Sequence, residues 1–302
     1  MSVVAIGNFD GVHRGHQAVL QEAREGGLSR LIVVTFWPHP EAVLRPERAP
    51  KLLTDLHLRL QLLREAGADE VRVVRFNPAV ASMTPEEFVE EFLLPLKPRH
   101  IVVGSNFHFG AKAAGDARTL ARLSAGRYDV KSVALRSVEE ATTSSTLIRG
   151  LLAEGDVEGA AKHLGRPFEF RGLVVVGDRR GRGLGFPTAN LVVPNEMAVP
   201  ADGVYAGWLT RVDIPGGTPM PTAISVGSNP TFEGLERRVE GYVIDRDDLN
   251  LYGVEVSVDF EHRLRGQHRF DSVDELITQM HDDVAETRRL LGRGPGPRPA
   301  GL

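Results

Sequence analysis

Short apolar runs alternate with amphipathic helical patterns through the first half of this 302-residue chain, and the alternation ends at Arg166–Pro167. Strands that alternate with helices are typical of a parallel sheet with helices on both faces, because parallel neighbours need a crossover connection. The expected strands are residues 3–6, 31–36, 71–75, 101–103 and 130–135. The first half therefore predicts an α/β domain.

Helix start signals lie between these apolar runs. Thr54 is expected to cap a helix that ends at Gly67, and Thr84 opens the sequence Thr-Pro-Glu-Glu, which is typical of a capping box. Two further helices are expected to begin near Thr146 and Asp156. These helices supply the crossovers that a parallel sheet requires.

The second half has a different pattern. Six short strands are expected, separated by turns rich in Gly, Pro and Asn, at residues 173–176, 191–193, 204–209, 223–226, 240–244 and 254–260. No helix between them is long enough for a crossover, so the pattern predicts an antiparallel β-barrel, and one amphipathic helix beginning near Ser272 closes it. We therefore expect two domains, 1–166 and 167–302, with a tail from about residue 293 whose Pro/Gly-rich composition predicts disorder.

Composition narrows the function classes. A formal net charge of −4 and a pI near 6.2, without a long basic run, argue against nucleic acid as the main partner. The absence of cysteine excludes disulfides and thiolate metal sites and fits a reducing compartment. No apolar run approaches the roughly 20 residues of a membrane span, and no signal-peptide pattern is present. We expect a cytoplasmic protein that acts on small molecules, with no oligomer indicated.

The segment GNFDGVHRGHQ at residues 7–17 lies where a buried strand passes into a helix. Free backbone N–H groups and the positive end of the helix dipole attract phosphate at such a turn. Gly7 and Gly11 keep side chains out of a ligand's way, and His13 and His16 lie on one face of the first turn. Both rings can then reach one phosphate and stabilise negative charge that grows during phosphoryl transfer.

Two other interpretations of this segment remain open. A histidine pair spaced by three residues could hold a metal, although no third ligand is evident in the sequence. The histidines could also lie in an ordinary surface turn. The complete pattern resembles the H-x-G-H signature of the nucleotidyltransferase superfamily, which moves a nucleotidyl group from a nucleoside triphosphate and does not by itself identify the acceptor.

The segment GDRRGRGLGFPTAN at residues 177–190 is a cationic glycine loop that leads into a strand. A dinucleotide-binding interpretation fails, because Phe186–Pro187 and a strand follow where that motif needs a helix. Thr188 and Asn190 stand two residues apart on the strand, so their oxygens point the same way, as binding of Mg²⁺ and phosphates would require. The alternative is an ordinary glycine hairpin.

The chain resembles the bifunctional prokaryotic riboflavin kinase/FMN adenylyltransferase family, also called FAD synthetase. The resemblance runs from about residue 3 to residue 290. It rests on the strings GNFDGVHRGHQ, TFWPHP, VGSNFHFG, SSTLIR, GRGLGFPTAN, GVY, SVGSNPTF, VEGYVID, DLNLYG and RFDS, which occur in the family's order. It implies a Rossmann-like N-terminal adenylyltransferase domain and a C-terminal Greek-key barrel kinase domain. The implied substrates and products are ATP, riboflavin, FMN and FAD, with Mg²⁺ as cofactor.

The resemblance assigns roles in the N-terminal domain. His13 and His16 would contact the ATP phosphates and stabilise the transition state, with Gly7, Asn8 and Gly15 beside them. A second phosphate motif comprises Ser144, Ser145, Thr146 and Arg149. Hydroxyls at a helix start with an arginine one turn later suit a triphosphate, although a plain helix cap is the alternative. Three phenylalanines, Phe36, Phe107 and Phe109, could stack on the flavin or belong to the core.

In the C-terminal domain the resemblance makes Thr188 and Asn190 the groups that hold Mg²⁺ and ATP. It makes Glu240 the base that takes the 5′-hydroxyl proton of riboflavin, whereas without the resemblance a solvated strand glutamate would be the simpler interpretation. The phosphate-binding glycines would be Gly177, Gly181, Gly183 and Gly185, and the segment that closes over the flavin would contain Arg269 and Phe270.

Two functions from other classes compete with the bifunctional enzyme. The chain could be a flavin-binding sensor or storage protein of the same descent, which loss of a catalytic group would indicate, and no such loss is visible. It could also join the kinase to an adenylyltransferase with a different acceptor, because flavin specificity in the first domain depends mainly on resemblance.

Overall fold

The computed structural model describes residues 2–25, 30–134, 137–138, 141–176, 186–231, 234–292 and 294. The chain divides into two compact units, Met1–Ser145 and Thr146–Arg298. The expected boundary at 166/167 lies later in the chain than this division, which groups the helices of residues 145–164 with the second unit. The position at which the chain can be cut into independently folding domains remains a prediction.

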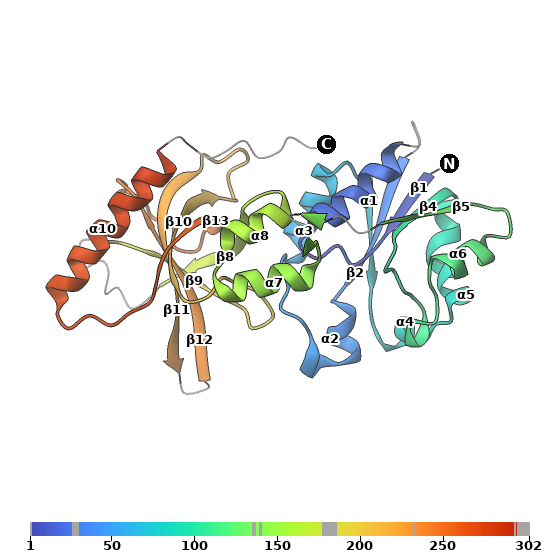
Figure 1. The fold of residues 1–302 in the computed structure, drawn as a ribbon, viewed down its shortest axis with the longest axis horizontal. Helices are drawn as coiled ribbons and strands as arrows, with labels where there is room; N and C mark the ends of the chain where they lie inside the picture. Colours follow the sequence, from blue (N-terminus) through green and yellow to red (C-terminus); the bar gives the residue numbers. More distant parts are fainter. Residues whose placement is uncertain are drawn as a thin grey trace. The chain divides into compact units, whose positions relative to one another are not determined.

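The first unit is built on a five-stranded parallel sheet in the order β3-β2-β1-β4-β5 (Figure 1). Its strands are β1 (Ser2–Ile6), β2 (Arg30–Trp37), β3 (Glu70–Arg75), β4 (Pro98–Gly104) and β5 (Asp129–Val133). All five expected strands are present, and each pairs in parallel with its neighbours. The order reverses between β1 and β4, and ligands bind at the carboxyl ends of strands at such a reversal in α/β sheets.

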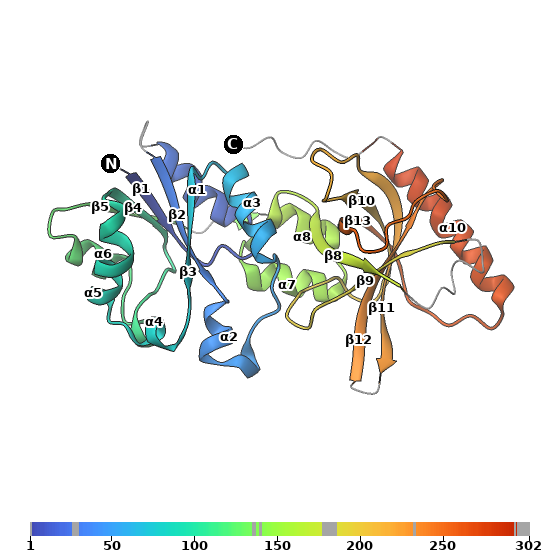
Figure 2. The ribbon, with the colours of Figure 1, turned by 180° about the vertical axis from the view of Figure 1, so that it is seen from behind.

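Alternate residues of β1 enter two separate cores. Val3 and Ala5 pack with Leu20 of helix α1 (Arg14–Glu25) and Leu63 of helix α3 (Leu56–Glu65), whereas the opposite face of the strand packs with the helices before and after β4. Figures 1 and 2 show these helices on the two faces of the sheet. The helices of this unit are α1 (Arg14–Glu25), α2 (Pro40–Leu44), α3 (Leu56–Glu65), α4 (Pro78–Ser82), α5 (Pro85–Phe88) and α6 (Ala117–Ser124).

The expected helix caps had different outcomes. Thr84 forms the capping box with Glu87 at the start of α5. The expected cap at Thr54 is wrong, because Asp55 caps α3 by accepting from the Leu58 N–H at 2.8 Å. Thr54 is instead fully buried and accepts a hydrogen bond from the Gly11 N–H at 3.2 Å. Its hydroxyl is thus used to hold the loop after β1.

The second unit contains the closed antiparallel barrel that the sequence predicts. Its strands are β8 (Phe168–Val175), β9 (Ala189–Val192), β10 (Gly203–Arg211), β11 (Met220–Thr231), β12 (Gly234–Val243) and β13 (Glu255–Gly266). They follow the order β10-β11-β12-β9-β8-β13, and β13 closes the barrel on β10. Strands β10, β11 and β12 are consecutive and β13 returns beside β10, which is Greek-key topology.

The described residues of the same unit include the helices α7 (Ser145–Glu154), α8 (Val157–Leu164) and α10 (Val273–Leu291). Helix α8 packs against β8 and β13, and the closing helix α10 packs against β10, β11 and β13. Leu291 near the end of α10 joins the buried cluster of Ala206 and Trp208, whereas Val273 at its start is 57% exposed. In the described part of the chain, no helix is long and apolar enough to cross a membrane.

Candidate active sites

The loop after β1 in the first unit is held in a conformation that side chains rarely adopt. Phe9 and Val12 are both 1% exposed and anchor the loop in the core, yet their φ angles are +52° and +41°. Gly11 between them has φ +84°. A β-branched residue at positive φ is a backbone outlier that persists only where the surroundings over-determine it, and such outliers cluster at functional sites.

His13 and His16 lie together at the start of α1. Their rings stack with centroids 3.6 Å apart, and the His16 N–H donates to His13 Nδ1 at 3.3 Å. His13 therefore precedes the helix as its cap instead of lying in the first turn. A nitrogen that accepts a hydrogen bond carries no proton, so this contact holds the proton of a neutral His13 ring on Nε2. The structure confirms that the two rings lie next to each other.

The pKa of His16 lies well below its ordinary value of 6.5. Burial is the largest cause, followed by the electrostatic interactions with His13 and with Arg59. Two buried polar atoms of this segment, His16 Nδ1 and Asn8 Oδ1, have no hydrogen-bond partner among the described residues. Buried polar groups are nearly always paired in native structures. These two atoms are therefore the groups that a bound ligand would satisfy.

The second phosphate motif begins beside this loop. The Ser145 hydroxyl donates to the Asp10 carbonyl at 2.9 Å. A Cβ at Gly15 would lie 3.1 Å from the His13 ring and 3.6 Å from the Thr143 carbonyl, so the missing side chain allows this close approach. The structure thus brings the segment around Ser145 to the histidine loop within one unit. Thr146 and Arg149 are grouped with the other unit.

A buried ionic network, which no sequence motif indicated, holds the loop after β1. Arg59 is 0% and Asp10 is 1% exposed, and their side chains are 3.0 Å apart. The Asp10 carboxylate also accepts from the N–H groups of Leu53 and Thr54 at 3.1 Å. The signal that could have found it is an arginine on the apolar stripe of α3, where Leu58 and Leu62 are also buried.

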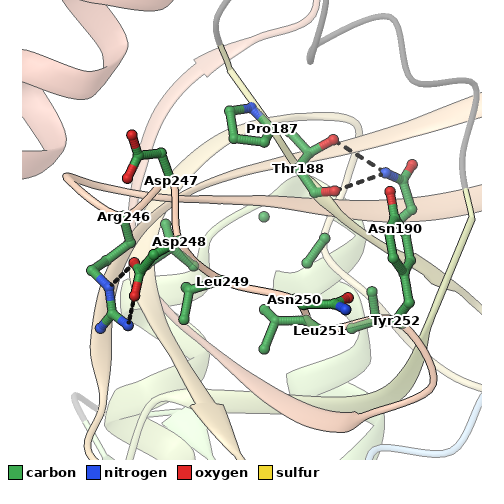
Figure 3. A pocket seen from close by; sticks show the side chains of 14 residues that line it. Pro187, Thr188, Asn190, Arg246, Asp247, Asp248, Leu249, Asn250, Leu251 and Tyr252 are labelled. Carbon is green, nitrogen blue, oxygen red and sulfur yellow. Dashed lines mark hydrogen bonds and ion pairs between the residues drawn. The ribbon is translucent and has the colours of Figure 1, made fainter.

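In the second unit Thr188 and Asn190 line a cavity of about 580 Å³ (Figure 3). The Asn190 side-chain amide donates to the Thr188 hydroxyl at 3.1 Å and to its carbonyl at 3.3 Å. Figure 3 shows the opposite wall formed by the loop between β12 and β13, with Arg246, Asp248 and Asn250. Since its amide nitrogen is bonded to Thr188, Asn190 keeps its amide oxygen for another partner.

Glu240 stands directly opposite Asn190 in the ladder between β12 and β9. It is half-buried and lines a different cavity, of about 350 Å³. Asp202, Ser225, Ser228, Arg238 and Gln267 line the same space, so most of the wall is polar. The Gln267 amide ties the end of β13 to β11 by donating to Ser225 Oγ at 3.0 Å. A carboxylate therefore faces a polar cavity one strand away from the Thr188–Asn190 pair.

Comparison with known proteins matches both units in this order. Residues 1–147 match the model of the FAD synthetase family, and residues 164–291 match that of the riboflavin kinase family. The chain is 36% identical to the bifunctional riboflavin kinase/FMN adenylyltransferase of Bacillus subtilis, over 96% of this chain and 92% of that protein. It is also 36% identical to the Escherichia coli protein of the same name, over 96% and 93%.

The chain belongs to the bifunctional riboflavin kinase/FMN adenylyltransferase family. The resemblance drawn from the sequence motifs is thereby confirmed. A solved structure named as a macrolide-efflux protein from Streptococcus pneumoniae has the same fold, with a TM-score of 0.86 and 34% identity over 95% of this chain and 93% of its own.

The remaining predicted site residues fall into three groups. Gly177, Gly181, Gly183 and Gly185 lie outside the described residues. Phe36 and Phe109 are 8% and 6% exposed within the core beside β4, and Phe107 is partly buried and stacks on Phe109 at 5.6 Å. Arg269 and Phe270 lie between β13 and α10, with the Phe270 ring 4.2 Å from that of His268. A flavin-stacking role for any of these aromatic residues remains a prediction.

Proposed function

We propose that the second unit phosphorylates riboflavin to FMN with ATP, and that the first unit adenylylates FMN to FAD with release of pyrophosphate. The observation that carries this proposal is the match of the two units, in order, to FAD synthetase and riboflavin kinase along nearly the whole chain. Each unit also has its own cluster of polar groups suited to phosphate chemistry. The protein would use small molecules, in the cytoplasm.

Adenylyl transfer in the first unit needs no general base, because the attacking FMN phosphate is already an anion. A phosphate oxygen of FMN would bond to the α-phosphorus of ATP, and the bond from that phosphorus to the bridging oxygen would break. His13 and His16, with the loop at Asn8, are suited to stabilise the charge that develops on the phosphoryl oxygens. Ser144 and Ser145 would hold the leaving pyrophosphate, and a phosphate-binding role for Thr146 and Arg149 remains a prediction from the family motif.

Phosphoryl transfer in the second unit begins with a neutral hydroxyl, so a base is required. Glu240 would accept the proton as the 5′-oxygen of riboflavin bonds to the γ-phosphorus, and ADP would leave. Thr188 and Asn190 would hold Mg²⁺, since hydroxyl and amide oxygens are ligands that this hard cation prefers. The ion would neutralise charge on the ATP phosphates. Phosphate binding by Gly177, Gly181, Gly183 and Gly185 remains a prediction, since these glycines lie outside the described residues.

A time course with purified protein, riboflavin, ATP and Mg²⁺ tests both steps. FMN should rise before FAD, and pyrophosphate should appear in step with FAD. Flavin that binds without turnover would support the sensor or storage function instead. FMN that accumulates while another phosphorylated acceptor is adenylylated would support a different acceptor for the first unit. FAD formation that does not depend on ATP would contradict the proposal.

A further inference from the structure

The buried guanidinium of Arg59 makes hydrogen bonds to three separate segments of the first unit. It donates to Asp10 Oδ1 at 3.0 Å, to the Asn8 carbonyl at 3.1 Å and to the Phe36 carbonyl at 3.4 Å. Its Nε also donates to Thr54 Oγ1 at 3.3 Å. The group therefore joins the loop after β1 to the end of β2 and to the start of α3.

Stability alone does not explain such a residue in the core. Replacing a buried ion pair by apolar residues is often neutral or stabilising, because two charges lose their hydration on burial. The buried neighbours of Arg59 on α3, such as Leu58 and Leu62, are apolar, so packing at this face does not require a charged side chain. Asp10 is part of the strained loop that carries the histidines, and Arg59 is paired with it. This placement indicates a role in what the loop does.

The contacts fix the loop where a phosphate would bind. The Asn8 carbonyl is held by Arg59 and by the Thr35 hydroxyl at 3.0 Å. These two hydrogen bonds fix the backbone of Asn8. Its side-chain oxygen is buried and has no hydrogen-bond partner among the described residues. The Trp37 ring lies against the guanidinium, with the Arg59 carbon 5.4 Å from the ring centroid. The cation is thus enclosed by carbonyls, one carboxylate and an aromatic ring.

Arg59 also sets the electrostatic environment of the histidines. The ionisable groups that face His16 are His13 from the loop and Arg59 from α3, and the pKa of His16 is lowered by both, after burial. The Asp10 carboxylate is paired with the Arg59 guanidinium at 3.0 Å. The positive charge of Arg59 therefore favours the neutral form of the His16 ring in the ligand-free protein.

We propose that Arg59 is a positioning residue for adenylyl transfer, which holds the Asn8–His16 loop through Asp10 and Asn8 and places a permanent positive charge behind the His13–His16 pair. Arg59 does not itself touch the reacting atoms. The role of this residue in catalysis rests on the proposed function of the first unit. Its effect on the loop and on His16 belongs to the ligand-free protein and can be measured without turnover.

Three full-length variants test this inference. Arg59→Met removes the charge and the hydrogen bonds, and Arg59→Lys keeps the charge but loses the planar fork. Arg64→Met makes the same chemical change at an exposed position of α3 and is the matched control. Measurements are the kcat and KM for FAD formation from supplied FMN, the rate of FMN formation, and the NMR titration of the His16 ring without ligand.

Both Arg59 variants should lower the kcat of FAD formation by about 10²-fold, the cost of misplacing a catalytic group by roughly 1 Å. FMN formation in the other unit should be unchanged. The His16 titration should move to higher pH in Arg59→Met and stay near its original position in Arg59→Lys. Arg64→Met should match the unchanged protein in every measurement.

An unchanged kcat in both Arg59 variants overturns the positioning role, and an unchanged His16 titration in Arg59→Met overturns the electrostatic one. If the first unit of Arg59→Met does not fold, Arg59→Lys decides the positioning role, and loss of fold in both assigns Arg59 to stability alone. If the unchanged protein makes no FAD, the proposed function fails, while the His16 titration still tests the effect of Arg59.

Discussion

Asn190 and Glu240 lie directly opposite each other on strands β9 and β12, yet they line different cavities. Opposite residues in an antiparallel ladder have Cβ atoms about 5 Å apart. The candidate metal and nucleotide groups and the candidate base are therefore one cross-strand pair apart. Such an arrangement suits transfer of a phosphoryl group from a nucleotide in one cavity to a hydroxyl in the other. The ladder fixes this relation more rigidly than two loops could.

The first prediction removes the base. Glu240→Gln keeps the size of the side chain but cannot accept the hydroxyl proton, so FMN formation should fall by about 10²- to 10⁴-fold. Conversion of supplied FMN to FAD should continue at its original rate, which also shows that the protein is folded. Separation of the flavins over time measures both. Normal riboflavin phosphorylation by this variant would remove Glu240 from the mechanism.

The second prediction concerns Mg²⁺. Asn190→Ala should raise the Mg²⁺ concentration needed for half-maximal FMN formation by about 10-fold or more. Loss of a group that only orients a metal ligand already costs roughly 10- to 100-fold in metal affinity, and Asn190 would bind the ion directly. Asn195→Ala, on the exposed turn after the same strand, is the control and should not change this requirement. If Asn190→Ala responds to Mg²⁺ as the unchanged protein does, the ion is held elsewhere.

The third prediction removes a histidine from the other site. His16→Ala should lower FAD formation by about 10²- to 10³-fold, because the ring would meet charge that develops during transfer. FMN should accumulate, since Glu240 and its cavity belong to the other unit. General unfolding would lower both activities together, so the contrast between the two rates is the measurement. FAD synthesis at the original rate would show that His16 has no part in the reaction.

The fourth prediction is a pH dependence of stability. His16 has a pKa well below 6.5 in the folded protein, so below about pH 6.5 the unfolded chain binds a proton that the folded chain excludes. Stability of the first unit should therefore fall as the pH drops below about 6.5. Thermal unfolding at several pH values should show a smaller fall in His16→Gln. His57→Gln, at an exposed position of α3, should leave the fall unchanged.

The fifth prediction tests where the chain can be cut. Residues 168–302 should phosphorylate riboflavin, and residues 146–302 should do so with higher stability. Helices α7 and α8 bury Leu152, Val157 and Leu164, each worth about 1.5–3 kcal/mol, and Arg263 on β13 donates to the Glu154 carbonyl at 2.7 Å. Calorimetry of the two fragments compares them. Kinase activity only in the full chain would show that the barrel does not function independently.

Local physical rules account for what the sequence determined by itself. Short apolar runs and the turn residues between them identified all eleven strands of the sheet and barrel, although not the short hairpin of β6 (Ser137–Val138) and β7 (Ala141–Thr142). The motif strings identified the family. His13 and His16 could be paired from their spacing alone, because residues three apart lie on one face of a helical turn.

Only the tertiary structure decided which polar residues act together. Asp10 and Arg59 are 49 positions apart, and Asn190 and Glu240 are 50 apart, so no local pattern links them. Thr54 illustrates the reason, since its position in the sequence suits a helix cap. In the fold its hydroxyl accepts a hydrogen bond from the Gly11 N–H, and Asp55 caps the helix instead. Sequence patterns report the preferences of neighbouring residues, whereas burial makes distant polar groups satisfy one another, because an unpaired group in the core costs more than a lost local contact.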